Sequence, residues 1–182
     1  MAEPIGFFGG TFDPIHFGHL RTAFELLQSL KLAQVRFLPT GDPPHREAPL
    51  ANAKLRCEMV SAAVVGQPGF SVDDREIRRE GVSYTIDTLT ELRQENPQRS
   101  LCLLLGMDAF LGMPTWRRWR EIFDLCHVVV AHRPGWKAPV TGPLGEVMVD
   151  RGTGSVRDLR YLVPDAVRDL IQRSGCYAAR NR

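Results

Sequence analysis

The sequence predicts an α/β fold in which a doubly wound parallel sheet forms a single domain over residues 1–182. Three observations lead to this prediction. Short apolar segments alternate with longer segments whose apolar residues recur at helical spacing. The apolar segment at residues 101–106 is continuous, which is typical of a strand buried on both faces. The chain has 182 residues, 43% of them hydrophobic, which is enough for a sizeable core.

The first half of the chain supplies three expected strands and three expected helices. The strands are expected at residues 5–8, 35–39 and 70–72. The helices are expected from apolar residues at Leu20, Ala23, Phe24, Leu27 and Leu30, at Leu55, Met59, Ala62 and Ala63, and at Ile86, Leu89 and Leu92. Ser83 or Thr85 is available as the N-cap of the third helix. The charged residues 73–80 are interpreted as a solvated turn.

The second half continues the alternation. Strands are expected at residues 101–106, 128–131 and 146–149, and helices over residues 115–125 and from Pro164 onward. The three clearest strands are followed by Gly9-Gly10, by Gly106-Met107-Asp108 and by His132-Arg133-Pro134-Gly135. Because ligands bind beyond the carboxyl ends of parallel strands, these three loops are expected to meet at one crevice.

Composition narrows the classes of partner and compartment. The net charge of +2 is only mildly basic, so small anionic substrates are expected rather than nucleic acid. No apolar run approaches the ~20 residues that span a bilayer, and no signal peptide is visible, so no membrane partner is expected. The four cysteines are widely spaced and are interpreted as free, buried thiols in a reducing, cytoplasmic compartment.

The segment from Gly9 to His19 carries the strongest functional signal. Two glycines and Thr11 lie between an expected strand and an expected helix, and His16 and His19 lie three residues apart at the helix start. Glycine lets the backbone approach an anion, and a helix start offers unpaired N–H groups and a positive dipole end. The segment therefore predicts a phosphate site to which the histidines add donors. A zinc half-site is the alternative, but no cysteine or carboxylate stands at ligand spacing, so no metal ligand is predicted.

The run G-G-T-F-D-P-I-H-F-G-H resembles the signature of the nucleotidyltransferase superfamily, in the form found in bacterial nicotinate-nucleotide adenylyltransferases. Pantetheine-phosphate adenylyltransferases usually have asparagine where His16 stands. The resemblance implies a Rossmann-like fold and transfer of AMP from ATP, with Mg²⁺, to nicotinate mononucleotide, giving deamido-NAD and pyrophosphate. It implies that His16 and His19 are catalytic. It further implies phosphate contacts from Gly9, Gly10, Thr11, Phe12 and Gly18.

Four further segments match elements of that family. Pro43-Pro44-His45-Arg46 would bring His45 and Arg46 to the ATP phosphates, although by itself it suggests an ordinary surface loop. Helix-start amides near Tyr84 and Thr85 would bind the pyridine carboxylate. Gly106 and Asp108 would contact the ribose, although Asp108 could instead be an N-cap. Trp116 would stack on the pyridine ring and Trp119 would pack, although two core tryptophans are the plainer interpretation. Arg133 would hold the mononucleotide phosphate.

One family element is missing from the sequence. The second phosphate signature, I-S-[SA]-T-x-I-R, should follow the strand expected at residues 146–149, but Gly154 onward already resembles what comes after it. We therefore expect that a segment is absent between about Asp150 and Ser155. Alternatives to the nicotinate enzyme are a pantetheine-phosphate adenylyltransferase-like enzyme, a cytidylyltransferase-like enzyme and an inactive nucleotide-binding module. The expected ligands are ATP and nicotinate mononucleotide, and an oligomer is possible.

Overall fold

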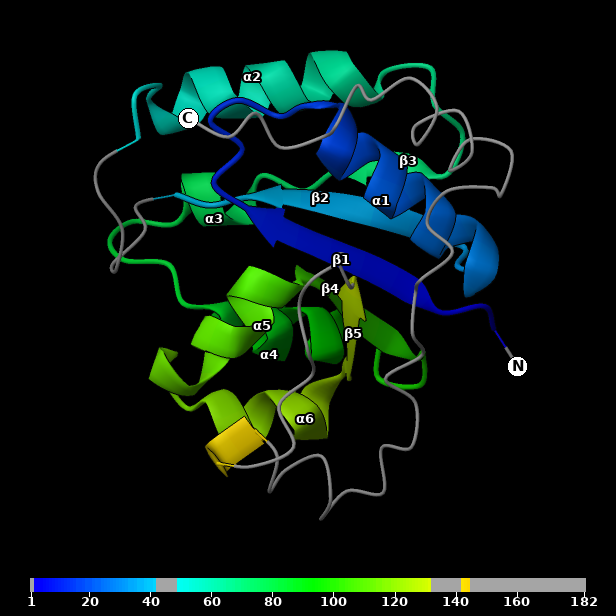
Figure 1. The fold of residues 1–182 in the computed structure, drawn as a ribbon, viewed down its shortest axis with the longest axis vertical. Helices are drawn as coiled ribbons and strands as arrows, with labels where there is room; N and C mark the ends of the chain where they lie inside the picture. Colours follow the sequence, from blue (N-terminus) through cyan, green and yellow to red (C-terminus); the bar gives the residue numbers. More distant parts are fainter. Residues whose placement is uncertain (1, 42–48, 132–141, 145–182) are drawn as a thin grey trace, which may run out of the picture.

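The computed structural model describes residues 2–41, 49–131 and 142–144. Its centre is a five-stranded sheet in the order β3-β2-β1-β4-β5 (Figure 1), and all four pairs of neighbouring strands are parallel. The strands are β1 Ile5–Gly10, β2 Gln34–Pro39, β3 Phe70–Val72, β4 Leu101–Gly106 and β5 His127–Ala131. The predicted α/β class and parallel sheet are confirmed, and each strand expected within the described residues is present.

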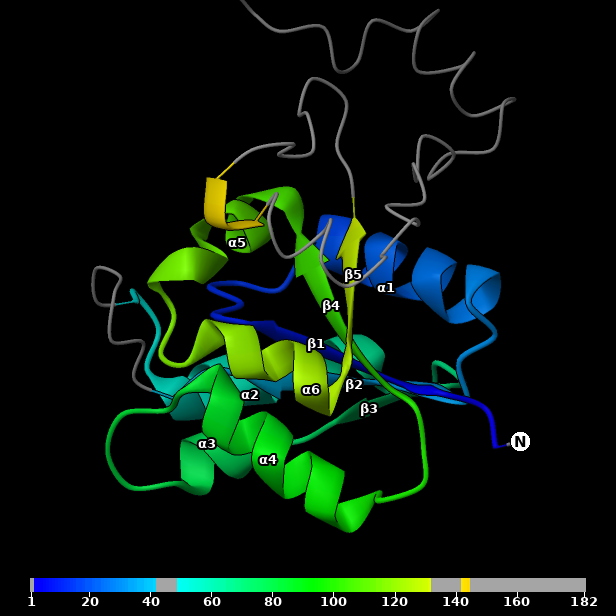
Figure 2. The same cartoon turned by 90° about the horizontal axis from the view of Figure 1, so that it is seen from below.

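Helices cover both faces of the sheet (Figures 1 and 2). The helices are α1 Phe17–Ser29, α2 Ala53–Val64, α3 Arg75–Arg78, α4 Thr85–Glu95, α5 Met107–Gly112 and α6 Ile122–Leu125. Two short 3₁₀ turns, Met113–Thr115 and Trp119–Glu121, lie between α5 and α6. One apolar cluster joins the sheet to α1 and α2, and a second joins it to α4, α5 and α6. The sheet is therefore doubly wound, as the alternating pattern predicts.

The strand order determines where a ligand can bind. From β1 the chain first builds β2 and β3 on one side, and then crosses to build β4 and β5 on the other. The direction of winding reverses between β1 and β4, and a crevice forms at the carboxyl ends of strands at such a reversal. β1 ends at Gly10 and β4 ends at Gly106, so the two glycine-containing turns singled out in the sequence flank this point.

Three local expectations are wrong. The helix expected over residues 115–125 is broken, because Arg118 adopts a left-handed conformation with φ 51° between the two 3₁₀ turns. The N-cap of α4 is Tyr84 and not Ser83 or Thr85, since the Ser83 hydroxyl donates to the Glu76 carbonyl instead. The charged residues 73–80 are not a solvated turn, since they include α3 and the buried Glu76.

The buried face of α2 also differs from the expected one. The apolar spacing predicts a face through Leu55 and Met59, but Leu55 is 46% exposed. The face turned inward instead carries Arg56, Val60 and Val64. Hydrogen bonds from Arg56 to buried carbonyl groups explain the rotation, because they compensate for burying a guanidinium at a position where an apolar side chain would be expected. Among the described residues, no helix is long and apolar enough to cross a membrane.

Candidate active site

The turn after β1 is open at its glycines and closed by aromatic packing beneath. A Cβ at Gly9 would meet no atom within 4 Å, so the backbone there faces open space. Phe12 has φ 49° and is 2% exposed, and its ring packs edge-on against Phe8 with 6.0 Å between ring centroids. The left-handed residue turns the chain sharply, and burial of its ring anchors the turn. The backbone at residues 9–12 is thus fixed below and accessible above, as an anion site requires.

The two histidines of the signature lie against each other at the start of α1. Their rings stack with centroids 3.8 Å apart, and the His16 backbone N–H donates to Nδ1 of His19 at 3.3 Å. Nδ1 of His19 is therefore an acceptor, which leaves the proton of the neutral ring on Nε2. The Phe12 ring packs edge-on against the His19 ring, with 5.1 Å between the ring centroids. A Cβ at Gly18 would lie 3.0 Å from the His16 ring, so glycine there makes room for this arrangement.

Arg56 ties this turn to the neighbouring strand. Its side chain is 1% exposed and donates to the carbonyl oxygens of Thr11 at 2.6 Å, Thr40 at 2.7 Å and Gly41 at 2.9 Å. The first of these carbonyls belongs to the turn after β1, and the other two directly follow β2. One guanidinium therefore holds the ends of two adjacent strands in register. The sequence analysis did not identify Arg56, although an arginine next to the apolar positions of a helix is a detectable signal.

Asp13 connects the same turn to the start of α2. Its carboxylate accepts the backbone N–H groups of Leu50 at 2.6 Å and Ala51 at 3.1 Å. The loop between β2 and α2 is thereby attached to the signature turn. This role was also missed, because the contacting residues lie 37 and 38 positions away in the chain.

A cavity of about 120 Å³ opens beside the turn, between the carboxyl ends of β1 and β4 and the start of α4. Its wall is largely aliphatic, and its other lining residues include Gly9, Gly10, Glu76, Thr85 and Trp116. Trp116 is half-buried and lines the cavity, whereas Trp119 is 7% exposed and packs against Phe123. The two tryptophans therefore occupy the two environments expected for them, although not on one continuous helix.

The start of α4 forms one side of this cavity. Thr85 is the first residue of an 11-residue helix and lines the cavity, and no side chain caps the helix. The N–H groups of Thr85 and Ile86 cannot have partners within the helix, because the first N–H groups of a helix never do. Arg117 lies over the Tyr84 ring, with 4.8 Å from its guanidinium carbon to the ring centroid. The structure thus provides amide donors and a partial positive charge at the cavity.

Asp108 lies after β4, in the first turn of α5. It is exposed, and it is not an N-cap, because that position belongs to Gly106. A Cβ at Gly106 would lie 2.6 Å from Oδ1 of Asp108, so glycine leaves room for the carboxylate in this orientation. The carboxylate is therefore exposed just after the carboxyl end of β4.

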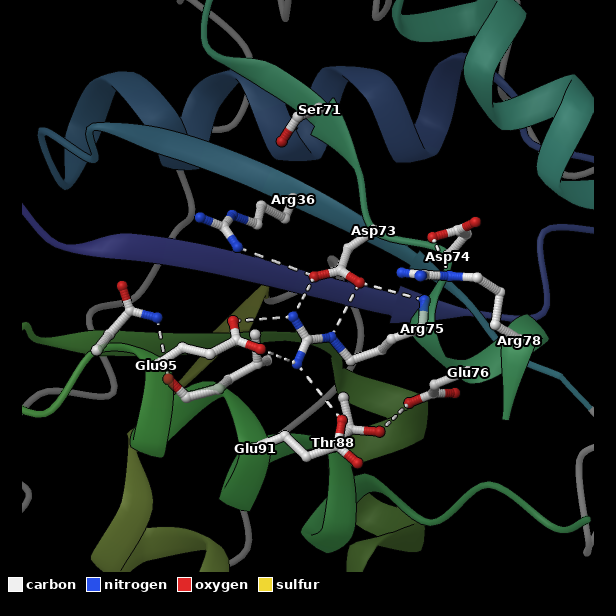
Figure 3. Close-up of polar contacts among 12 residues, drawn as sticks. Arg36, Ser71, Asp73, Asp74, Arg75, Glu76, Arg78, Thr88, Glu91 and Glu95 are labelled. Atoms are coloured by element: carbon white, nitrogen blue, oxygen red, sulfur yellow. Dashed lines mark hydrogen bonds and ion pairs between the residues drawn. The ribbon is translucent and has the colours of Figure 1, made fainter. Parts of the chain in front are cut away.

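A network of charged residues lies between α3 and the C-terminal half of α4 (Figure 3). Arg75 forms two hydrogen bonds with Asp73, at 2.9 and 2.8 Å, and two with Glu95, at 2.9 and 3.0 Å. Burial alone would raise the pKa of Asp73, but the hydrogen bonds and charge of Arg75 outweigh it and hold this pKa below its usual value. These contacts fix α3 against α4.

Glu76 lies at the edge of the network, on the side of the cavity. It is 8% exposed, and its Oε1 accepts a hydrogen bond from the Thr88 hydroxyl at 2.8 Å. Burial raises the pKa of Glu76, against the opposing effects of the Thr88 hydrogen bond and the Arg79 charge. From its charged neighbours in the sequence, this residue was expected in a solvated turn and not beside a cavity.

The remaining site predictions lie outside the described residues. They concern His45 and Arg46 after β2, Arg133 after β5, and the absent segment expected between about Asp150 and Ser155. Of the predicted residues that the structure does describe, Gly9, Gly10, Thr85 and Trp116 line the cavity. The histidines lie at the start of α1, in the segment that follows these glycines, and Asp108 lies in the first turn of α5. Within the described part of the chain, no group of three histidine, cysteine, aspartate or glutamate residues is placed to hold a metal ion.

Comparison with known proteins decides the family. The family model described as cytidylyltransferase-like matches residues 7–170. A protein of Acidithiobacillus ferrooxidans named probable nicotinate-nucleotide adenylyltransferase is 53% identical over 203 residues, which cover 93% of each chain. The chain belongs to the nicotinate-nucleotide adenylyltransferase family. The resemblance inferred from the signature is thereby confirmed.

The fold agrees with a solved structure at low sequence identity. The Plasmodium falciparum nicotinic acid mononucleotide adenylyltransferase complexed with NaAD has a TM-score of 0.68 at 15% identity. The match covers 81% of this chain and 71% of that one. At this identity the comparison bears on the fold alone, and it confirms the Rossmann-like prediction.

One comparison also bears on chain length. The alignment with the Pseudomonas syringae pv. tomato relative, also named probable nicotinate-nucleotide adenylyltransferase, has 39% identity and uses 100% of this chain and 96% of the relative. It extends over 216 residues, so about 34 aligned positions have no counterpart among the 182 residues here. The difference supports the expected loss of an internal segment, whose place near Asp150 stays a prediction.

Proposed function

We propose that this member of the family transfers AMP from ATP to nicotinate mononucleotide, giving deamido-NAD and pyrophosphate. The observation that carries the proposal is the cavity between the signature turn and the start of α4, lined by Gly9, Thr85 and Trp116. In this cavity the glycines of the signature turn lie near the Trp116 indole and the N-terminal end of α4. These groups match the phosphates, the planar ring and the carboxylate of the two substrates.

The proposed reaction is an in-line displacement at the α-phosphorus of ATP. A phosphate oxygen of the mononucleotide forms the new bond to this phosphorus, and the bond to the bridging oxygen of pyrophosphate breaks. The attacking oxygen is already anionic, so no general base is required. Catalysis then rests on positioning and on stabilising the charge that develops on pyrophosphate.

The site residues receive the following proposed roles. His16 and His19 donate to the triphosphate, and the backbone from Gly9 to Phe12 with Gly18 holds the reacting phosphates. Gly106 and Asp108 contact the ribose of the nucleotide. Tyr84, Thr85, Trp116 and Arg133 bind the mononucleotide, while His45 and Arg46 approach the ATP phosphates. Support comes from the signature match and from the cavity that Gly9, Gly10, Thr85 and Trp116 line together.

Mg²⁺ enters the proposal as part of the substrate. Enzymes that transfer nucleotides from ATP generally use a divalent metal, and Mg²⁺ binds phosphate oxygens while keeping several waters. We propose that it arrives as MgATP and takes few ligands from this chain. The other partners proposed are small molecules; a cytoplasmic location and an oligomer stay predictions.

Selectivity for nicotinate over nicotinamide follows from the start of α4. The N–H groups near Thr85 favour an anionic carboxylate, whereas a carboxamide would turn an N–H₂ donor toward other donors. We expect a higher kcat/KM with nicotinate mononucleotide than with the nicotinamide form. Parallel turnover assays with the two mononucleotides test this, and equal values would contradict a carboxylate site at α4.

Removing the indole of Trp116 should weaken mononucleotide binding selectively. Trp116→Ala is expected to raise KM for the mononucleotide by about tenfold, since loss of an aromatic stacking partner costs roughly 0.5–1.5 kcal/mol beyond the lost buried area. The KM for ATP should change little. Trp119 is not a suitable control because it is buried, so the exposed Arg120→Ala serves instead. A Trp116→Ala enzyme with both KM values unchanged would exclude the stacking role.

A second function is favoured by the missing positions. If about 34 residues that include a phosphate signature are absent, the chain could bind nucleotides without turning them over. Isothermal titration with ATP beside a turnover assay separates the two functions. Binding of ATP and of the mononucleotide without pyrophosphate release would favour the inactive module.

A further inference from the structure

The cavity that would receive the pyridine ring contains one ionisable side chain among its described lining residues. That side chain is Glu76, and the other lining residues are glycine, alanine, leucine, threonine and tryptophan. A buried carboxylate without a cation is costly, so its presence in an otherwise uncharged wall calls for a partner. The established signature does not explain it, since Glu76 lies 57 positions beyond His19.

Hydrogen-bond directions show which oxygen of Glu76 is already in use. Arg79 Nη1 donates to the Thr88 hydroxyl oxygen at 3.0 Å, and an arginine can only donate. The Thr88 hydroxyl hydrogen is therefore directed to Oε1 of Glu76, at 2.8 Å. Oε1 is an acceptor in this arrangement (Figure 3), which leaves Oε2 as the oxygen that a proton or a ligand can occupy. Burial raises the pKa of Glu76, and the Thr88 hydrogen bond and the Arg79 charge oppose this effect by favouring the carboxylate. A cation in the cavity would favour the carboxylate further.

The surroundings of Glu76 do not neutralise the charge of its carboxylate completely. The charged groups that act on it are Arg79, Asp73 and Glu91. Arg79 forms a direct ion pair with Glu91 at 2.7 Å, so its charge is shared. Arg75 is held by Asp73 and Glu95. Among the described residues, Oε2 of Glu76 has no hydrogen-bond partner, and this oxygen is not fully buried. One oxygen of the carboxylate is therefore left for a ligand.

The substrate of the proposed function carries the complementary charge. In nicotinate mononucleotide the ring nitrogen is bonded to ribose, so the ring is a pyridinium cation as well as a carboxylate. The cavity volume of about 120 Å³ is comparable to the roughly 150 Å³ in which an apolar protein cavity holds a benzene ring. Trp116 offers the face that attracts a cationic ring, and the α4 amides attract its carboxylate.

We propose that Glu76 is a specificity-determining residue whose carboxylate pairs with the positive ring of the pyridinium mononucleotide in this cavity. The inference rests on the proposed function, because it concerns the same substrate. It adds that the site recognises the positive charge of the ring through Glu76, separately from the carboxylate that the α4 amides bind. A ligand of identical shape with an uncharged ring should therefore bind less tightly.

The test compares two ligands that differ in one atom of the ring. One is nicotinate mononucleotide, and the other is 3-carboxyphenyl riboside 5′-phosphate, in which carbon replaces the cationic nitrogen. Isothermal titration gives the ratio of the Kd of the phenyl ligand to that of the pyridinium ligand. We expect a ratio on the order of tenfold for the wild type and near unity for Glu76→Gln. Arg78→Met is the control, because Arg78 lies on the same helix, is 70% exposed and pairs with Asp74; its ratio should equal that of the wild type.

The pH dependence of the wild-type ratio provides a test that needs no variant. The ratio should rise with pH as the Glu76 carboxyl loses its proton, and fall as the pH drops and the carboxyl gains one. The ligand phosphates titrate alike and cancel in the ratio. Arg79→Met removes the charge that favours ionised Glu76, so the fall should move to higher pH.

The outcomes separate the inference from the function on which it rests. Equal ratios in the wild type and Glu76→Gln, or a wild-type ratio that rises as the pH falls, would overturn the pairing while leaving the mononucleotide site intact. Failure of the wild type to bind either ligand would overturn the proposed function and the pairing together. A wild-type ratio that decreases toward low pH supports the pairing even if Glu76→Gln does not fold.

Discussion

Replacing His19 with alanine is expected to lower kcat by two to three orders of magnitude, since loss of one donor to developing charge costs ~3–4 kcal/mol. His19 lies in the signature turn, and its Nδ1 accepts the His16 N–H, so its Nε2 carries the proton that can be donated to phosphate. Binding of the mononucleotide should change little, because charge builds up on pyrophosphate and not on the pyridine ring. Steady-state kinetics with varied ATP and varied mononucleotide measure both effects.

Phe17→Ala is the matched control for His19→Ala. Phe17 lies in the same helical turn and is 88% exposed, so its removal disturbs neither the core nor the histidine pair. It should keep the wild-type kcat. Turnover by the His19→Ala enzyme at the wild-type rate would remove His19 from the mechanism.

Replacing Arg56 with methionine is expected to lower the free energy of unfolding by about 3 kcal/mol or more, because three carbonyl groups lose their donor and each unsatisfied buried polar group costs about 1–3 kcal/mol. Arg56 is 1% exposed, and its loss leaves the carbonyls of Thr11, Thr40 and Gly41 without their donor. Urea unfolding followed by circular dichroism gives the change as a lower midpoint. Because Thr11 belongs to the signature turn, kcat should fall as well.

Lys54→Met controls for the loss of a positive charge on the same helix. Lys54 is exposed and lies near the start of α2, so the free energy of unfolding of this variant should stay within about 0.5 kcal/mol of the wild-type value. An Arg56→Met protein as stable as this control would show that the three carbonyls do not depend on the guanidinium.

The sheet could be predicted from the sequence because a buried strand is a short, continuous run of apolar residues. β4 is apolar at every position from Leu101 to Leu105, and all five of these residues are buried. The turn after β1 was equally visible, because glycines and histidines at a strand–helix junction have a direct physical meaning. Local chemistry within a few consecutive residues was enough for both.

The errors arose where partners come from distant parts of the chain. Arg56 is turned inward by carbonyls 15 to 45 positions away, which apolar spacing cannot reveal. Glu76 is buried by α4, and its charged neighbours suggested solvent because the sequence does not show that Arg75 pairs with Glu95, 20 positions later. Arg118 broke the expected helix through a left-handed conformation that its residue type does not favour.

The burial of the described cysteines was predicted correctly for two of them and not for the third. Cys102 and Cys126 are buried and free, as their apolar surroundings predict, and burial raises the pKa of Cys126 to about 12. Cys57 is only half-buried, because it lies on α2 next to the inward-facing Arg56. Its position follows from the same rotation of α2 that the apolar pattern did not predict.

Pyrophosphate release by the purified 182-residue chain, supplied with MgATP and nicotinate mononucleotide, tests the central claim most directly. The account predicts release that requires both substrates and is accompanied by deamido-NAD in equal amount. The rate should be lower when nicotinamide mononucleotide replaces nicotinate mononucleotide, and also when CTP replaces ATP. If ATP and nicotinate mononucleotide both bind but no pyrophosphate appears, the chain is a nucleotide-binding module and the proposed transfer is contradicted.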